Sequence, residues 1–356
     1  MEKTSRNVIN VLIVDDSAFM RTALERMMKA DPCIRVIGTA SNGLEAIERT
    51  LRLKPDVITL DIEMPVMDGL HALKEIMRVA PLPVLIVSSL TKEGAQVTLD
   101  ALELGAVDYL PKPGSGISTK MFSIQKELVT KVRHLAESKP LIQRLDLAKA
   151  ITPSVPQRKH AKFHAIKKAV FIGASTGGPP AIQRILSELP ANLNAPIIIA
   201  QHMPSSFTKA FADRLNRICN IKVKEAVDRE LLQNSVVYIC PGDMQTTVEK
   251  SIKGEYKFKI VSEDFSSNKF APSIDVLMFS AAKEFGANAI GILLTGMGDD
   301  GARGLKNIFL VGGLTMAQDK ETSVVFGIPR AAIEMQAVSR ILPLNDFAEE
   351  IKLGLL

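Results

Sequence analysis

Cysteine, tryptophan and long apolar runs are scarce or absent in this sequence of 356 residues. Its three cysteines lie far apart, which excludes a disulfide framework and a zinc site of the usual spacing. The longest apolar runs, such as APIIIA at 195–200, have the length of a strand, whereas a membrane-spanning helix needs about 20 residues. The N-terminal apolar run is short and ends in acidic residues, unlike a signal peptide. We therefore expect a soluble cytoplasmic protein.

Basic charge is scarce outside one segment. The net charge is +5, yet residues 139–168 contain eight lysines and arginines and a single aspartate, so the remainder is slightly acidic. Nucleic-acid-binding proteins concentrate basic charge on a globular face, so this distribution argues against a nucleic-acid partner. Because the segment also contains three prolines and weak periodicity, we interpret residues 139–167 as a linker. Contact of this segment with an acidic partner or with the flanking domains is the alternative.

Both halves of the chain alternate strand-like runs with helical patterns. The runs of the first half are 11–15, 34–40, 56–62, 83–89 and 107–111, with a closing helix at about 118–138. Those of the second half are 169–174, 196–202, 236–240 and 289–295, with a β-hairpin at 247–261 that we expect to be attached to the parallel sheet. Such alternation predicts parallel sheets covered by helices. The expected fold class is α/β, with two doubly wound domains: a (βα)5 domain at 1–138 and a Rossmann-like domain at 168–356.

Polar residues follow the predicted strands of the first half, namely Asp15, Asp16, Asp61, Ser88 and Lys112. Because the carboxyl ends of parallel strands meet at one edge of a sheet, we expect these side chains to converge. Clustered carboxylates suit a hard cation such as Mg²⁺, and an aspartate can accept a phosphoryl group as an acyl phosphate. Capping of the following helices is the alternative role for the aspartates.

Four motifs of the first half, VLIVDDS, DVITLDIEMPVMDG, PVLIVSS and DYLPKP, resemble the receiver domain of two-component response regulators over about residues 8–130. The resemblance implies that Asp61 is phosphorylated by a histidine kinase. It implies an Mg²⁺ site formed by Asp15, Asp16, Asp61 and Glu63, the last through its backbone carbonyl. It also implies a phosphate switch formed by Ser88, Tyr109 and Lys112.

The stretch FIGASTGGPP at 171–180 follows a predicted strand in the second half. Its glycines lack the G-x-G-x-x-G spacing of a dinucleotide loop, and no lysine follows as in a P-loop. Residues 173–177 do match G-x-S-x-G, the turn that exposes a nucleophilic serine, which would be Ser175. A plain glycine-rich turn remains the alternative.

A nucleophilic serine needs a base and an orienting acid. Of the five histidines only His202 follows Ser175, and it lies at the end of the next predicted strand. A third strand leads into GMGDDG, which offers Asp299 and Asp300. Either aspartate could instead cap the following helix. The chain order Ser, His, Asp differs from that of α/β-hydrolases, so the motif does not imply that fold.

The motifs FIGASTGGP, AQHMP, ILLTGMGDDGARG and AQDKETSVVFGIPRAA resemble the catalytic domain of chemotaxis protein-glutamate methylesterases, over about residues 168–352. The resemblance implies a catalytic triad of Ser175, His202 and Asp300. It also implies an oxyanion site lined by the backbone of Thr176 and Met297. The chain departs from the family at Ala271, where an arginine is usual, and lacks a histidine after Pro241-Gly242.

Together the two resemblances imply a phosphorylation-regulated serine hydrolase that demethylates, and also deamidates, chemotaxis receptors. The expected cofactor is Mg²⁺ in the first domain, with none in the second. The expected partners are methyl-accepting receptors as substrate and a chemotaxis histidine kinase as phosphodonor, and the expected oligomeric state is a monomer. A response regulator with a non-enzymatic or DNA-binding output is one alternative, although residues 168–356 lack a helix-turn-helix signature. A nucleotide-dependent oxidoreductase is the other.

Overall fold

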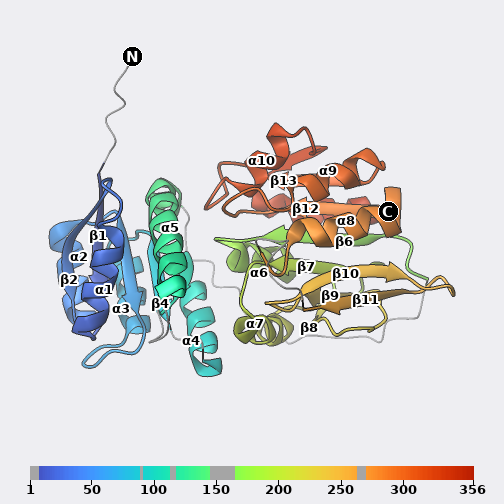
Figure 1. Cartoon of the computed structure of the whole chain (residues 1–356). Helices are drawn as coiled ribbons and strands as arrows, with labels where there is room; N and C mark the ends of the chain where they lie inside the picture. The colour runs from blue at the N-terminus through green and yellow to red at the C-terminus, as the bar shows by residue number, and fades with distance from the viewer. Residues whose placement is uncertain (1–7, 89–90, 113–117, 145–164, 263–269) are drawn as a thin grey trace, which may run out of the picture. The chain divides into compact units, whose positions relative to one another are not determined.

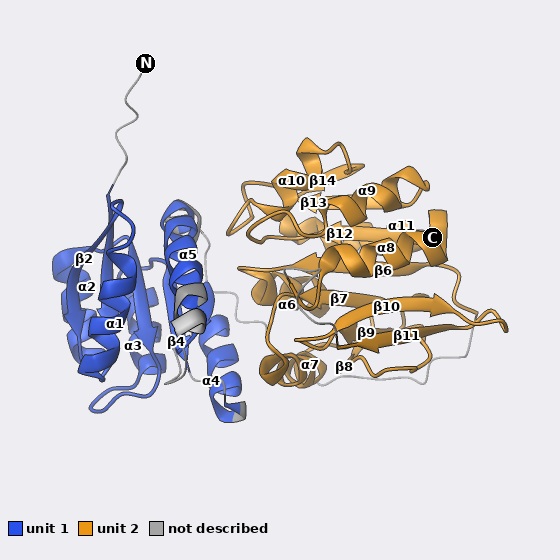
Figure 2. Ribbon diagram, in the orientation of Figure 1, with its two compact units in different colours: residues 1–149 blue, residues 150–356 orange. Residues whose placement is uncertain are grey.

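The computed structural model describes residues 8–88, 91–112, 118–144, 165–262 and 270–356 (Figure 1). Contacts divide the chain into two compact units, residues 1–149 and 150–356 (Figure 2). Most of the predicted linker lies outside the described residues. No helix in the described ranges combines the length and the apolar character needed to cross a membrane. Cys33, Cys219 and Cys240 are all free thiols.

The first unit is a five-stranded sheet in the order β2-β1-β3-β4-β5, with every neighbouring pair parallel. Its strands are β1 (Ile9–Val14), β2 (Ile34–Ala40), β3 (Val57–Asp61), β4 (Val84–Ser88) and β5 (Asp108–Pro111). Its helices are α1 (Ala18–Met28), α2 (Gly43–Leu53), α3 (Gly69–Val79), α4 (Lys92–Glu103) and α5 (Ser118–Arg144). The predicted (βα)5 domain is confirmed. Helix α5 continues beyond the expected end at residue 138, into the segment predicted as linker.

Local signals set the starts of four helices in this unit. Ser17, Asn42, Asp68 and Thr91 each accept a hydrogen bond from a backbone amide in the first turn of α1, α2, α3 and α4, respectively. Helices α1 and α5 contact each other on one face of the sheet, whereas α3 contacts both α2 and α4 on the other. The central strands are therefore buried on both faces, as in β1, where residues 11–14 are at most 1% exposed.

The second unit is a seven-stranded sheet in the order β14-β13-β12-β6-β7-β9-β8, again wholly parallel. Its strands are β6 (Ala169–Ala174), β7 (Ile197–Gln201), β8 (Lys222–Glu225), β9 (Val236–Ile239), β12 (Ala289–Leu293), β13 (Leu314–Gln318) and β14 (Arg340–Leu342). Its α-helices are α6 (Gly178–Ser187), α7 (Ser205–Ile218), α8 (Ile274–Phe285), α9 (Ala302–Leu310), α10 (Ile328–Glu334) and α11 (Phe347–Leu355). The Rossmann-like sheet is confirmed. Three of its strands, β8, β13 and β14, were not predicted.

The predicted hairpin consists of β10 (Gln245–Lys250) and β11 (Tyr256–Val261), which pair antiparallel. The expected attachment to the parallel sheet is wrong, because the hairpin forms its own two-stranded sheet. The alternation of apolar residues gives the hairpin one apolar face, on which Val248 and Phe258 are buried, and β10 lies along α8 (Figure 1). The hairpin therefore packs against this helix and does not pair with an edge strand of the parallel sheet. Tyr256 stacks on Phe285 of α8 with ring centroids 4.0 Å apart. The hairpin thus anchors the helix that begins beside the second candidate site.

Candidate functional site

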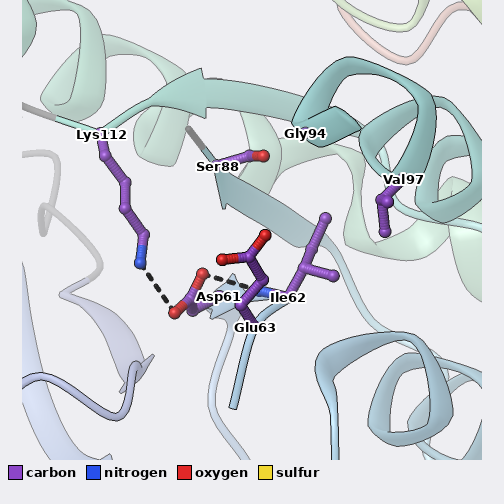
Figure 3. Close-up of a pocket in the computed structure, with 7 residues that line it drawn as sticks. All are labelled: Asp61, Ile62, Glu63, Ser88, Gly94, Val97 and Lys112. Carbon is purple, nitrogen blue, oxygen red and sulfur yellow. Dashed lines mark hydrogen bonds and ion pairs between the residues drawn. The ribbon is translucent and has the colours of Figure 1, made fainter. Parts of the chain in front are cut away.

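In the first unit the predicted polar residues meet at the carboxyl edge of the sheet. The closest carboxylate oxygens of Asp15, Asp16 and Asp61 all lie within 4.8 Å of one another. Lys112 Nζ lies 2.7 Å from Asp61 Oδ2 (Figure 3). It also lies 3.3 Å from Asp15 Oδ2. The pocket above Asp61 is lined by Asp61, Ile62, Glu63, Ser88, Gly94, Val97 and Lys112. The expected convergence is therefore present.

The Asp61 carboxylate is buried with few hydrogen-bond donors. Its Oδ1 accepts a hydrogen bond from the amide of Ile62 at 2.8 Å. Burial raises the pKa of Asp61 above its ordinary value; the Lys112 ammonium opposes that rise, and the Asp15 carboxylate adds to it. Beyond the ion pair with Lys112, the buried Asp15 Oδ2 and Asp61 Oδ2 have no hydrogen-bond partner among the described residues. Oxygen ligands with this unfilled capacity fit a divalent cation such as Mg²⁺.

A close backbone approach explains the glycine after Asp68. A Cβ atom at Gly69 would lie 2.1 Å from the carbonyl oxygen of Asp61, so only glycine lets α3 begin so near the site. Of the expected switch residues, Ser88 and Lys112 line the pocket. Tyr109 is only 5% exposed and is contacted by Lys131 of α5, whose Nζ lies 5.4 Å from the ring centroid.

In the second unit Ser175, His202 and Asp300 form a hydrogen-bonded chain. They follow β6, β7 and β12, which are neighbours in the sheet with β6 in the middle (Figure 1). His202 Nδ1 lies 3.2 Å from Ser175 Oγ, and His202 Nε2 lies 2.8 Å from Asp300 Oδ2. Three side chains that are distant in sequence therefore have the connectivity of a nucleophile, a base and an orienting acid.

The imidazole of His202 is turned relative to that of chymotrypsin-like enzymes. There the serine contacts Nε2 and the acid contacts Nδ1, whereas here Nδ1 faces Ser175 and Nε2 faces Asp300. An Nε2–H that donates to Asp300 leaves the Nδ1 lone pair directed at Ser175 Oγ. The pairing fixes the tautomer that general-base action requires.

Asp300 is surrounded by donors at the start of α8. Its carboxylate accepts hydrogen bonds from the amides of Ile274 (2.7 Å) and Asp275 (3.0 Å) and from Ser273 Oγ (3.0 Å). Burial opposes its ionisation, but the contact with His202 and these amides hold the pKa of Asp300 below its ordinary value. Asp299, the other candidate acid, is exposed.

Asp275 has the reciprocal arrangement with α9, which sequence analysis missed. Its Oδ1 accepts hydrogen bonds from the amides of Gly301 (3.0 Å) and Gly304 (2.7 Å), and its Oδ2 accepts one from Arg303 Nε (2.9 Å). Each of α8 and α9 therefore has its first amides bound by an acid from the start of the other helix. The available signal was the acidic residue in PSID, which lies in the first turn of α8.

A sharp turn presents Ser175. Gly177 has φ of +76°, which favours glycine, and α6 begins at the next residue with prolines in its first turn. Gln201 Nε2 donates to the Ser175 carbonyl at 2.9 Å. A Cβ at Gly296 would lie 2.8 Å from Ser175 Cβ, so the Gly296–Met297 loop lies against the serine. Thr176, directly after Ser175, accepts a hydrogen bond from Thr295 Oγ1 at 3.0 Å. Both expected oxyanion residues thus belong to segments that adjoin Ser175.

The aromatic ring of Phe270 covers His202. The two rings are stacked, with centroids 4.3 Å apart and an interplanar angle of 12°. The neighbouring Ala271, where the expected family pattern has an arginine, accepts a hydrogen bond from the amide of Asp243 through its carbonyl. The departure at Ala271 therefore lies next to the residue that stacks on His202.

Comparison with known proteins gives a family for both units. The model of the CheB methylesterase family matches residues 170–351, just over half of the chain, and that of the response regulator receiver domain matches residues 11–118. A protein-glutamate methylesterase/protein-glutamine glutaminase of Archaeoglobus fulgidus is 46% identical over 344 residues, which cover 96% of this chain and 97% of the relative. One of the same name from Pyrococcus abyssi is 41% identical over 351 residues, covering 96% and 92%.

A solved structure supports the same family assignment for the second unit. The CheB methylesterase catalytic domain of Thermotoga maritima is 39% identical, covers 52% of this chain and 97% of its own, and superposes with a TM-score of 0.51. The two predicted resemblances are thereby confirmed at the level of family. The chain belongs to the CheB methylesterase family and carries a response regulator receiver domain ahead of the methylesterase domain.

Proposed function

We propose that the chain is a phosphorylation-regulated serine hydrolase that removes methyl esters from glutamate side chains of chemotaxis receptors. The observation that carries the proposal is the hydrogen-bonded chain from Ser175 Oγ through His202 to Asp300 Oδ2. The names of the curated relatives support the ester substrate and the related glutamine amide.

The proposed reaction begins when Ser175 Oγ attacks the ester carbonyl and His202 Nδ1 takes the hydroxyl proton. The charge that develops on the imidazole is stabilised by Asp300, whose carboxylate is already held by the start of α8. Backbone groups of Thr176 and Met297 would stabilise the oxyanion. The imidazolium then protonates the departing methoxide, which leaves as methanol.

The second half of the reaction regenerates the serine. A water molecule loses a proton to His202 and attacks the acyl-enzyme, and Ser175 leaves with the proton returned by His202. The product is a free glutamate side chain. A glutamine amide would follow the same steps with ammonia as the leaving group, which is why one site serves both activities.

The receiver supplies the regulation in this proposal. Asp61 would accept the phosphoryl group from a chemotaxis histidine kinase as an acyl phosphate. Asp15, Asp16, Asp61 and the carbonyl of Glu63 would hold Mg²⁺, which neutralises phosphate charge when bound. Ser88 and Lys112, both lining the pocket, would contact the phosphate, and Tyr109 would respond to Ser88. We propose domains at 1–138 and 168–356, joined by a linker at 139–167, in a monomeric cytoplasmic protein.

A methanol-release assay on methylated receptor membranes tests the proposal. Wild type should release methanol, and a small phosphodonor such as acetyl phosphate should raise the rate. Ser175→Ala should lose about 10⁵-fold or more in rate. Asp61→Asn should keep the basal rate but not respond to the phosphodonor. Methanol release by Ser175→Ala at the wild-type rate would contradict the triad, and an unchanged response in Asp61→Asn would contradict the regulation.

A further inference from the structure

In the second unit, one buried side-chain amide forms hydrogen bonds with segment 270–273, which contacts both His202 and Asp300. Gln245, the first residue of β10, is 4% exposed. Its Oε1 accepts a hydrogen bond from the amide of Ser273 at 2.9 Å, and its Nε2 donates to the carbonyl of Phe270 at 2.7 Å. The two partners fix which end of the side-chain amide is oxygen and which is nitrogen. The Gln245 side chain therefore bridges the first and last residues of the four-residue segment 270–273.

Both ends of this segment contact the proposed triad. Phe270 stacks on the His202 ring with centroids 4.3 Å apart. Ser273 donates its hydroxyl proton to Asp300 Oδ1 at 3.0 Å, and its Oγ accepts the amide of Val276 in α8. One neutral side chain thus positions the aromatic cover of the base and a hydroxyl donor of the acid. Among the described residues Gln245 forms its hydrogen bonds with Phe270 and Ser273 and not with the proposed triad, so it acts through the two residues that it binds.

The residues before Gln245 tie the same segment to the loop that follows His202. The amide of Asp243 donates to the Ala271 carbonyl at 3.1 Å, and Asp243 Oδ2 accepts the amide of Ser205 at 3.1 Å. The amide of Gly242 donates to Thr208 Oγ1 at 3.2 Å. A Cβ at Gly242 would lie 2.3 Å from the Ser205 nitrogen, so the backbones touch. Residues 242–245 therefore connect the His202 side of the site to the Asp300 side.

We propose that Gln245 is a positioning residue for the hydrolase: it sets the placement of the His202 ring and the Asp300 carboxylate through Phe270 and Ser273. The inference rests on the proposed function, since it concerns the same triad. It follows from geometry, because a small displacement of a catalytic group costs a large factor in rate. It also follows from chemistry, because only a neutral group with one donor and one acceptor satisfies both backbone partners.

The test is a set of full-length variants compared in the methanol-release assay. Gln245→Met keeps the length of the side chain but can neither donate to Phe270 nor accept from Ser273 in this way. We expect kcat to fall about 10- to 100-fold while KM changes by about twofold or less, because substrate binding is spared and alignment is not. Thr247→Ala, on the same strand with a partly exposed side chain, is the matched control and should leave both constants unchanged.

A second variant remains informative if Gln245→Met folds poorly. In Gln245→Glu the introduced carboxyl, when protonated, can accept from Ser273 and donate to Phe270 as the amide does. When ionised it faces the Phe270 carbonyl without a donor. Burial and the nearby carboxylates of Asp243 and Asp300 disfavour its ionisation. The kcat of this variant, divided by that of wild type at the same pH, should therefore rise as the pH falls.

The outcomes separate this inference from the proposed function. A Gln245→Met protein with a lowered melting temperature but a wild-type kcat overturns the positioning role, as does a kcat ratio for Gln245→Glu that stays equally low at every pH. A second readout is the rate at which a small fluorophosphonate labels Ser175, which needs no receptor. A wild type that is labelled but releases no methanol contradicts the proposed substrate, and the labelling rates of the variants then decide the role of Gln245. A wild type that does neither overturns both.

Discussion

Asp61 and Asp300 are buried carboxylates at the carboxyl edges of two parallel sheets, yet their pKa values move in opposite directions. Asp61 has one backbone donor, one lysine and a neighbouring carboxylate, and burial raises its pKa. Asp300 is equally cut off from water but accepts hydrogen bonds from two amides, a hydroxyl and an imidazole, and its pKa is lowered. The number of donors, and not the degree of burial, decides which charge state each site favours.

The difference fits the two proposed roles. A carboxylate with unfilled oxygens can bind a cation and form a new covalent bond, so Asp61 is suited to act as an acceptor. A carboxylate whose oxygens are all engaged is fixed in place, so Asp300 is suited to orient a base without reacting. Two parallel sheets thus place the same type of side chain at their carboxyl edges for opposite proposed uses.

For the comparison of the two carboxylates, the largest effect is expected when the charge of Asp300 is removed. In Asp300→Asn the amide cannot accept the hydrogen bonds that the carboxylate takes from α8 and His202 at once, and the imidazole tautomer is no longer fixed. We expect kcat to fall about 10⁴-fold, as for an analogous change in the serine proteases. Phosphorylation of Asp61 by acetyl phosphate, measured in the same variant, should be normal. A kcat within tenfold of wild type would remove the contrast between the two carboxylates.

The second-largest effect is expected when the close backbone approach beside Asp61 is disturbed. Gly69→Ala would place a Cβ 2.1 Å from the Asp61 carbonyl oxygen, so α3 must shift. We expect the receiver to lose about 2–4 kcal/mol of unfolding free energy, and phosphorylation of Asp61 to slow. Chemical denaturation and a phosphorylation time course measure the two. Gly254→Ala in the hairpin turn is a control for a glycine with positive φ and open space, since its φ is +83° and no atom lies within 4 Å of the added Cβ.

A smaller effect is expected from coupling between the Asp61 site of the receiver and the proposed triad. The fragment 168–356, assayed for methanol release, should be about tenfold more active than the unphosphorylated full chain, which corresponds to about 1.4 kcal/mol of coupling. The expectation follows from inhibition by a receiver that restricts access until Asp61 is phosphorylated. Equal or lower activity of the fragment would contradict inhibition and favour direct stimulation by the phosphorylated receiver.

The smallest effect is on stability as a function of pH. Because the folded-state pKa of Asp61 is raised, its ionisation destabilises the receiver once the pH exceeds about 4. Asp61→Asn should therefore raise the receiver melting temperature by a few degrees at neutral pH, and the gain should vanish in acid.

Ionisation of Asp300 has the opposite effect on stability. Its lowered pKa means that it stabilises the fold above about pH 4, and that this contribution is lost as the pH falls through the folded-state value. Asp300→Asn should accordingly be less stable than wild type at neutral pH and approach it in acid. Thermal melts of both variants across pH 3 to 8 check the pair. Parallel curves for the two would contradict the reversed pKa shifts.

The sequence was informative wherever a polar residue followed a buried strand. Such positions predicted the convergence of Asp15, Asp61 and Lys112 and that of Ser175 and His202, because strand ends share an edge in any parallel sheet. Strands β8 and β14 were missed because KVKE and RIL are short and lie at the edges of the sheet, where apolar patterning is weak. Strand β13 was missed because LTMAQ has two polar residues among its five.

What escaped prediction depends on contacts between distant segments. Nothing local to Gln245 shows that it reaches Phe270 and Ser273, which are 25 and 28 residues away. The orientation of the His202 ring likewise depends on where Asp300 lies, 98 residues along the chain. The residue types indicated which chemistry the site could perform. The packing that aligns the reacting side chains can be seen only in the three-dimensional structure.

The exchange of capping acids between α8 and α9 has a consequence for motion. The amides of Ile274 and Asp275 are held by Asp300, and those of Gly301 and Gly304 by Asp275, so neither helix can fray without releasing its neighbour. Hydrogen–deuterium exchange at these four amides should occur in a single opening event, at a free energy near that of unfolding the whole unit. Ligand-binding sites usually belong to the loosest part of a fold. Here one wall of the proposed catalytic centre would be among the last places to open.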